Sequence, residues 1–174
     1  MNIFLIGYMG SGKSFFGKKL SDALSITNID LDFFLEKKEN MKIVDIFQQK
    51  GEKYFREIEK KYLLELMSDT EKYIISCGGG TPCFFNNITD MNTNGVTIYL
   101  KRKSDYLYNY LLNSKSKRPV FELLSSKENF LTHFQEREFF YLKSKLIIHC
   151  DNFLSNKEII ENIKNQLYDY RLKK

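Results

Sequence analysis

One eight-residue stretch, GYMGSGKS from Gly7 to Ser14, constrains the fold of this chain more than any other. It has the pattern G-x-x-x-x-G-K-S, whose glycines let successive backbone N–H groups converge on phosphate oxygens. Lys13 adds a cation for the β and γ phosphates, and the Ser14 hydroxyl is a natural ligand for Mg²⁺. An apolar run precedes the stretch and helical spacing follows it, so a helix N-terminus would also face the anion. This context predicts a loop that binds ATP or GTP, and it argues against a chance glycine-rich turn.

The length of 174 residues predicts a single domain over residues 1–174, too short for most motor or transporter ATPases. No segment approaches the length of a membrane span and no signal-peptide pattern is present, so we expect a cytoplasmic protein. The net charge of +5 is spread along the chain and suits small anionic substrates without requiring nucleic acid. Cys77, Cys83 and Cys150 share no ligand spacing, so we expect buried thiols, with neither a disulfide framework nor a zinc site.

Short β-rich runs alternate with longer stretches of helical periodicity, without an internal repeat. The runs predict buried parallel strands at 2–6, 26–30, 73–76, 96–100 and 146–149. The longer stretches predict helices at 13–24, 52–67, 105–112, 127–142 and 156–170. This alternation indicates an α/β fold with three layers, in which helices flank a five-stranded parallel sheet. Ligands of such sheets collect at the carboxyl ends of the strands, so the loops there should carry the chemistry.

The polar run 113–117, followed by Arg118 and Pro119, interrupts this order. We expect a mobile lid there, at about residues 113–126. Arg118 would close over the γ-phosphate with the lid and offset charge in the transition state. The alternative is a solvated basic residue in a loop.

Two carboxylates end the second predicted strand, whereas the third runs into glycines and lacks the Asp that many phosphate-loop proteins use for Mg²⁺. A spacing of two residues would place Asp30 and Asp32 on one side of an extended chain. Their mutual repulsion suggests that one serves the metal and the other the substrate. A carboxylate can orient an attacking hydroxyl and accept its proton. The alternative is that Asp30 caps the next helix and Asp32 lies in its first turn.

Arginine is scarce among the 27 basic residues of the chain, so we expect it where a planar fork for carboxylate or phosphate is needed. Arg56 has Glu59 three residues on, within reach of its guanidinium. Arg137 lies on an otherwise apolar helical stripe, where its alternative is a long side chain that reaches the surface. Arg102, among lysines, and Arg171, in a basic tail, are not candidates for the site.

Three consecutive glycines, Gly78, Gly79 and Gly80, follow the third predicted strand. Glycine at a strand end costs folding entropy, so flexibility alone is a poor reason for three of them. Their bare backbone would let a ligand approach and would offer it N–H donors. A plain tight turn is the alternative.

Taken in order, these segments resemble shikimate kinases over nearly the whole chain. The matching segments are the phosphate loop, the pair Asp30 and Asp32, the stretch GEKYFREIE from Gly51 to Glu59, the triple glycine, Arg118-Pro119, and Arg137 followed by Tyr141. The resemblance implies a nucleoside monophosphate kinase type of fold. It also implies transfer of phosphate from ATP to the 3-hydroxyl of shikimate, on the way to chorismate and the aromatic amino acids. We therefore expect a monomeric enzyme whose partners are shikimate and ATP with Mg²⁺, and neither nucleic acid nor a membrane.

The resemblance also implies roles for single residues. Lys13 and Arg118, with Asp32 as the base, would be catalytic. Nucleotide contacts would come from Gly10, Ser11, Gly12, Lys13, Ser14, Phe15 and Arg118, and the metal would be served by Ser14 and Asp30. Shikimate would be bound by Asp32, Phe55, Arg56, Gly78, Gly79, Gly80 and Arg137, with helices at about residues 32–62 forming its site.

The chain departs from the family pattern at three places, one of them Thr81-Pro82, where a small apolar residue usually follows the glycines. Family members commonly have Arg-x-Pro-Leu-Tyr where this chain has REFFY, from Arg137 to Tyr141. An arginine that stacks on adenine commonly precedes the lid, where this chain offers Tyr110 and Leu111.

Two alternative functions would use the same phosphate loop: a gluconate-type or nucleotide kinase, and a regulatory GTP-hydrolysing switch. The chain shows no specific signal for a base-binding acceptor pocket, and it lacks the Asn-Lys-x-Asp guanine signature of a switch.

Overall fold

The computed structural model describes residues 1–114, 119–150 and 153–172. Its strands are β1 (Asn2–Ile6), β2 (Thr27–Asp30), β3 (Tyr73–Ser76), β4 (Gly95–Lys101) and β5 (Leu146–His149). Its helices are α1 (Lys13–Leu24), α2 (Leu31–Glu39), α3 (Ile43–Ser68), α4 (Asn87–Asn94), α5 (Ser104–Leu112), α6 (Pro119–Glu122), α7 (Lys127–Tyr141) and α8 (Asn156–Leu172), with a 3₁₀ turn η1 at Thr81–Cys83. The predicted five-stranded α/β fold is confirmed, and none of the five predicted strands is missing.

The five strands form one parallel sheet in the order β2-β3-β1-β4-β5. Because β1 lies between β3 and β4, the chain first places β2 and β3 on one side of β1 and then β4 and β5 on the other. A crevice forms at such a switch point, beyond the carboxyl ends of the strands. The phosphate loop leaves β1 and the triple glycine leaves β3 at this edge, so the topology brings the two glycine-rich segments together.

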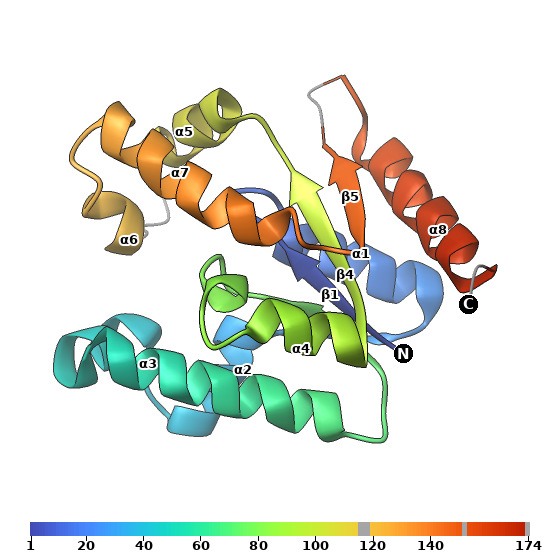
Figure 1. Ribbon diagram of the computed structural model, residues 1–174, viewed down its shortest axis with the longest axis horizontal. Coiled ribbons are helices and arrows are strands. Elements are labelled where there is room, and N and C mark those ends of the chain that lie inside the picture. Colours follow the sequence, from blue (N-terminus) through green and yellow to red (C-terminus); the bar gives the residue numbers. More distant parts are fainter. Residues whose placement is uncertain (115–118, 151–152, 173–174) are drawn as a thin grey trace.

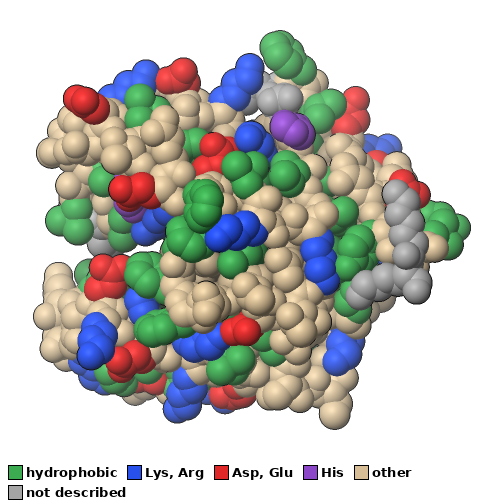
Figure 2. All heavy atoms as spheres, viewed as in Figure 1, with side chains coloured by type: hydrophobic (Ala, Val, Ile, Leu, Met, Phe, Trp, Pro, Cys, Tyr) green, Lys and Arg blue, Asp and Glu red, His purple; other side chains and the backbone are tan. Residues whose placement is uncertain are grey.

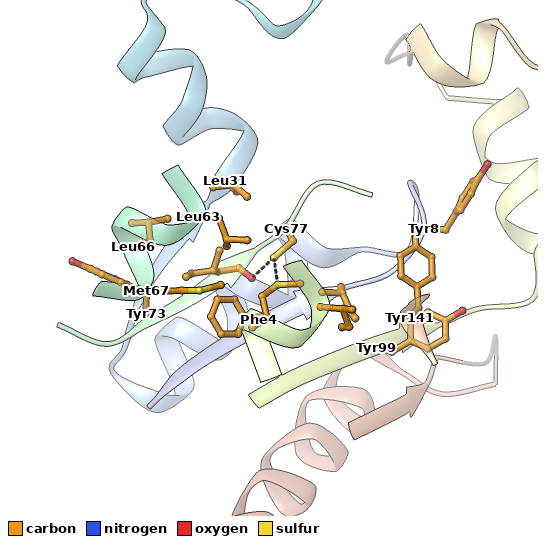
Figure 3. Packing of buried hydrophobic residues seen from close by; sticks show 14 of the residues in the cluster. Phe4, Tyr8, Leu31, Leu63, Leu66, Met67, Tyr73, Cys77, Tyr99 and Tyr141 are labelled. Carbon is orange, nitrogen blue, oxygen red and sulfur yellow. Dashed lines mark hydrogen bonds between the residues drawn. The ribbon is translucent and has the colours of Figure 1, made fainter. Parts of the chain in front are cut away.

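Helices cover both faces of the sheet (Figure 1). Alternate residues of β1 point to opposite faces, so Phe4 and Ile6 belong to one core cluster and Ile3 and Leu5 to another. The first cluster packs α3, α4, α5 and α7 against the sheet, and the second packs α1 and α8. Figure 3 shows part of the first cluster, with Leu63, Leu66 and Met67 toward one end and Tyr8, Tyr99 and Tyr141 at the other. Every side chain of β1 is buried, as parallel strands require when both faces are covered.

A third, smaller cluster holds α2 against α3 outside the sheet. Its buried members are Leu35, Ile46, Phe55, Ile58 and Tyr62. Helix α3 is broken at Gly51, whose φ of 79° lies in the left-handed region that a side chain disfavours. The break separates 43–50 from 52–68, and the sequence predicted only the second of these pieces. The two pieces and α2 project beside the sheet and form one wall of the candidate site (Figure 1).

The structure adds helices that the periodicity did not predict, namely α2, the first part of α3, α4 and α6. The first two lie in the region of about 32–62 where the family resemblance implied helices. Among the described residues, no helix combines the length and the apolar character needed to cross a bilayer. Cys77 and Cys150 are buried thiols as expected, whereas Cys83 is only partly buried, and none of the three forms a disulfide.

Candidate active site

Two adjoining cavities lie at the carboxyl edge of the sheet. The larger, of about 460 Å³, opens between α2–α3 on one side and Val120 of α6 and Arg137 of α7 on the other. Figure 2 shows the outline of the molecule notched between these two groups of helices. The smaller cavity, of about 220 Å³, follows the phosphate loop. The two share Met9, Ser14, Asp30, Asp32, Gly78 and Gly79 in their walls, so ligands in them would meet end to end.

The phosphate loop wraps the smaller cavity with the backbone geometry that its sequence requires. Gly10 and Gly12 have φ of 83° and 95°, which a residue with a Cβ would adopt only under strain. The Lys13 ammonium donates hydrogen bonds to the carbonyls of Gly7 at 2.8 Å and Tyr8 at 2.9 Å. Phe15 is partly exposed at the cavity wall. Six of the seven residues expected to contact the nucleotide belong to this segment, and five of them line the smaller cavity: Gly10, Gly12, Lys13, Ser14 and Phe15.

Ser11, the sixth, does not line the cavity. Its side chain is fully buried, and its hydroxyl has no hydrogen-bond partner among the described residues. Its amide donates to the Tyr8 carbonyl at 3.1 Å, and its own carbonyl accepts from Arg102 Nε at 3.3 Å. The seventh, Arg118, lies outside the described residues.

Asp30 and Asp32 both face the cavities, but not in the way that the spacing argument predicted. Strand β2 ends at Asp30, which caps α2 by accepting a hydrogen bond from the Phe33 amide at 3.3 Å. Asp32 is in the first turn of that helix, so the pair does not lie along an extended chain. The expectation of a shared strand face is therefore wrong, and the capping alternative describes the backbone. Both carboxylates still line both cavities.

Ser14 and Asp30 form the oxygen pair of the site, with the Ser14 hydroxyl donating to Asp30 Oδ2 at 2.5 Å. Hydroxyl and carboxylate oxygens are the donors that Mg²⁺ prefers, and this ion usually keeps several waters and takes other ligands from substrate phosphates. Within the described part of the chain, no group of three or more His, Cys, Asp or Glu residues could hold a metal alone. The two oxygens therefore fit a metal that arrives with a nucleotide.

Arg56 is buried in the wall of the larger cavity, with 5% of its surface exposed, and is held by two carboxylates. Its Nη1 donates to Glu59 at 2.9 Å, as the i,i+3 spacing predicted, and its Nε and Nη2 both donate to Glu52. The guanidinium also lies over the rings of Phe55 and Phe84. Phe55, one of the predicted substrate residues, thus packs against the arginine as well as lining the cavity.

Arg137 reaches the same cavity from the opposite side. It is half-buried, and its guanidinium forms no hydrogen bond or ion pair with any other described residue. Its Nη1 would lie 3.5 Å from a Cβ built on Gly79. The side chain therefore does not run to the outer surface, and the apolar stripe on α7 delivers it into the cavity.

The triple glycine runs between these groups, and two of its members leave no room for a side chain. A Cβ on Gly78 would lie 2.9 Å from Asp32 Oδ1, and one on Gly80 only 2.6 Å from Arg56 Nη2. Their φ values are not positive, so close approach of neighbouring side chains explains these glycines. The loop is fixed from outside by the Tyr141 hydroxyl, which donates to the Gly79 carbonyl at 2.6 Å.

Several residues of the site escaped the sequence analysis. Arg102 was set aside, yet its guanidinium donates to Ser11 and Cys150 carbonyls and so ties the phosphate loop to the end of β5. Glu52 was not singled out, although an acid four residues before Arg56 on a helix is a recognisable signal. Phe33, Val44 and Phe47 add an apolar wall from α2 and α3.

The family model with the description "Shikimate kinase" matches residues 9–168. A shikimate kinase of Azobacteroides pseudotrichonymphae is 42% identical over 164 residues, covering 92% of this chain and 96% of the relative. The crystal structure of shikimate kinase from Bacteroides thetaiotaomicron is 31% identical and superposes with a TM-score of 0.84, covering 97% of this chain and 98% of that one. The Acinetobacter baumannii shikimate kinase in complex with shikimate has a TM-score of 0.85 at 24% identity and covers 98% and 94%, which shows a common fold.

Proposed function

This chain belongs to the shikimate kinase family, and we propose that its two adjoining cavities hold the two substrates of that reaction, ATP in the smaller and shikimate in the larger. The enzyme phosphorylates the 3-hydroxyl of shikimate with ATP and gives shikimate 3-phosphate and ADP, in the pathway to chorismate and the aromatic amino acids. One observation supports this assignment of cavities above the others. Two arginine forks and a carboxylate, from Arg56, Arg137 and Asp32, line one cavity that adjoins the phosphate loop. Shikimate is a small carboxylic acid with vicinal hydroxyls, and this set of groups complements it.

In the donor site, Lys13 and the loop amides would hold the triphosphate. Moving the Lys13 ammonium from the Gly7 and Tyr8 carbonyls to a phosphate exchanges neutral acceptors for a charged one. Ser14 and Asp30 would hold Mg²⁺, which supplies charge neutralisation at the phosphates. Arg118 keeps its expected role in closing over the γ-phosphate as a prediction from the sequence.

In the acceptor site, Asp32 would hold the substrate hydroxyl and take its proton as the oxygen attacks the γ-phosphorus. The bond from that phosphorus to the oxygen bridging the β-phosphate breaks, and its electrons leave with ADP. Asp32 is suited to this because it lines both cavities. Arg56 and Arg137 would grip the carboxylate on the far side of the ring, with Gly79 and Gly80 beneath it.

These roles fit a single domain over residues 1–174. Within it, a lid at about 113–126 would move to close over the phosphates, and a part at about 32–62 would bind shikimate. The structure describes only part of that lid, including α6. Monomeric state and cytoplasmic location stay predictions, the first testable by light scattering.

The deciding experiment is ADP release from MgATP, with shikimate, quinate, gluconate and nucleoside monophosphates each offered as acceptor. We expect strong stimulation by shikimate alone. Stimulation by gluconate or a nucleotide would keep the donor site and overturn the roles of Arg56 and Arg137. If no acceptor stimulated ADP release, the regulatory switch would be favoured instead.

A further inference from the structure

Tyr8, the second residue of the phosphate loop, makes two different kinds of contact. Its backbone carbonyl accepts hydrogen bonds from the Lys13 ammonium at 2.9 Å and from the Ser11 amide at 3.1 Å. Its side chain leaves the loop and is fully buried in the core. A glycine-rich loop needs no aromatic side chain at this position to bind phosphate, so the buried ring has another purpose.

The Tyr8 ring packs against helix α7. It makes edge-to-face contacts with Phe130, His133 and Phe134, with ring centroids 5.3 to 5.6 Å apart. At its far end, the Tyr8 hydroxyl lies 2.6 Å from Nδ1 of His133, a short hydrogen bond. Figure 3 shows Tyr8 at the end of the core cluster where Tyr141 also lies.

His133 stands one helical turn before Arg137 on α7, so the two residues share a face of that helix. Arg137 faces the cavity proposed for shikimate, and Lys13 faces the cavity proposed for the triphosphate. The hydrogen bond thus joins the loop that holds one of these groups to the helix that carries the other. Gly79 lies between them, since a Cβ on it would be 3.5 Å from both the Met9 amide nitrogen and Arg137 Nη1.

We propose that Tyr8 and His133 are positioning residues whose hydrogen bond sets the placement of the acceptor-binding Arg137 relative to the phosphate loop. The inference rests on the proposed function. Neither residue is among those that line the two cavities. Phosphoryl transfer is sensitive to such placement, because a shift of about 1 Å in the relation of donor and acceptor can cost about a hundredfold in rate.

The hydrogen bond, and not packing alone, is suited to this task. A hydroxyl buried without a partner is costly, so the ring takes the one position at which Nδ1 meets it. Burial and the nearby positive charge of Arg137 lower the pKa of His133 to about 4, and burial raises the pKa of Tyr8 well above its usual value. Both side chains therefore stay neutral near pH 7, and their hydrogen bond forms without protonation of His133.

Four variants separate the bond from the packing. His133→Asn keeps a polar atom close to the position of Nδ1, His133→Leu fills the space without one, and Tyr8→Phe removes only the hydroxyl. The fourth combines Tyr8→Phe with His133→Leu. For each, the KM for shikimate, the kcat and the Kd for MgATP are measured beside a thermal melt.

We expect His133→Leu and Tyr8→Phe to raise the KM for shikimate and lower kcat, with kcat/KM down about tenfold, while the Kd for MgATP stays within about twofold. His133→Asn should recover most of this loss. The double variant should be no worse than either single one, because both remove the same bond.

Wild-type kinetics in His133→Leu would overturn the proposal, and so would equal losses in His133→Asn and His133→Leu or additive losses in the double variant. If His133→Leu does not fold, Tyr8→Phe carries the test with the same readouts. Turnover of shikimate by the wild-type protein tests the proposed function by itself. The ratios of kcat/KM between the variants test only the positioning role. The same double-mutant cycle, measured on the free energy of unfolding, gives the energy of the Tyr8–His133 hydrogen bond without any turnover.

Discussion

Glu52 occupies the fork of Arg56. Its Oε1 accepts hydrogen bonds from Nε at 3.2 Å and from Nη2 at 3.0 Å, on the edge of the guanidinium that a substrate carboxylate would use. Glu59 takes the remaining Nη1 from the buried side and also accepts from the Thr81 hydroxyl at 2.6 Å. Glu59 is almost fully buried, whereas the side chain of Glu52 is 55% exposed and can leave. The carboxylate of Glu52 therefore holds two N–H donors of Arg56 that we expect shikimate to use.

Replacing Glu52 with Gln is expected to lower the KM for shikimate about two- to fivefold with little change in kcat. An exposed ion pair contributes about 0.2 to 1 kcal/mol, and that is the competition a substrate carboxylate must overcome. Steady-state kinetics at saturating MgATP measures the effect. Glu57→Gln is the matched control, because Glu57 is exposed on the same helix and is not one of the two carboxylates that pair with Arg56 among the described residues. A raised KM in Glu52→Gln would mean that Glu52 orients Arg56 for the substrate.

Arg137→Lys is expected to raise the KM for shikimate at least about tenfold. A lysine keeps the charge, but it cannot present two parallel N–H donors to a carboxylate. Since Arg137 has no ion pair or hydrogen bond within the described ranges, its loss leaves no buried partner behind and stability should change little. Arg171→Lys in the last turn of α8 is the control for a generic effect of the substitution. A KM equal to that of the control would remove Arg137 from the carboxylate site.

Asp32→Asn is expected to lower kcat about 10²- to 10⁴-fold and to change the KM for shikimate far less, because it removes a base and keeps the shape of the side chain. Asp45→Asn, in the first turn of α3, is the control for loss of an acid near a helix N-terminus. Comparable losses of kcat and of affinity would make Asp32 a binding residue only.

Lys13→Ala is expected to abolish measurable turnover, because the loop would keep its glycines but lose the cation that positions the β and γ phosphates. The same variant removes the Lys13 hydrogen bonds to the carbonyls of Gly7 and Tyr8, so a thermal melt should accompany the assay. Lys18→Ala, an exposed lysine of α1, controls for net charge. A near-normal kcat in Lys13→Ala would overturn the assignment of Lys13 to the phosphates of ATP.

The strands and the phosphate loop were predictable because each rests on local pattern. Continuous apolar runs such as the one at Asn2–Ile6 have few alternatives when helical stretches surround them. The periodicity argument missed helix α2 because its nine residues are few for such an argument and carry four apolar and five charged side chains in LDFFLEKKE. With that helix unrecognised, Asp32 was assigned to an extended chain, and the spacing argument for the pair failed for the same reason.

The parts of the site that the sequence could not give depend on contacts between distant segments. The Tyr141 hydroxyl meets the Gly79 carbonyl across 62 residues, and Arg102 meets the Ser11 carbonyl across 91. Neither partner has a local signal, since a tyrosine in an aromatic helix and an arginine between lysines look ordinary. By contrast, Arg56 and Glu59 lie one helical turn apart, and their contact was foreseen from spacing alone.

We expect His133 to make the free energy of unfolding depend on pH in the acid range. Burial first, and then the charge of Arg137, lower its folded pKa to about 4 from 6.5, while Glu52 opposes this weakly. The Tyr8 hydroxyl also faces the ring, 2.6 Å from Nδ1. Between these two pKa values the unfolded chain binds more protons than the folded one, so the free energy of unfolding falls as the pH drops from about 6.5 to about 4.

Urea unfolding of the wild type and of His133→Asn at about pH 7 and about pH 5 isolates this contribution, because the carboxylates titrate alike in both proteins. The wild type should lose more stability over this interval than His133→Asn does. His149→Asn, at the exposed second histidine of the chain, is measured beside it as the control for replacing a histidine by asparagine. If wild type and His133→Asn lost stability equally, His133 would be protonated in the folded protein at acid pH. Its hydrogen bond to Tyr8 would then have to survive a positive charge placed beside Arg137.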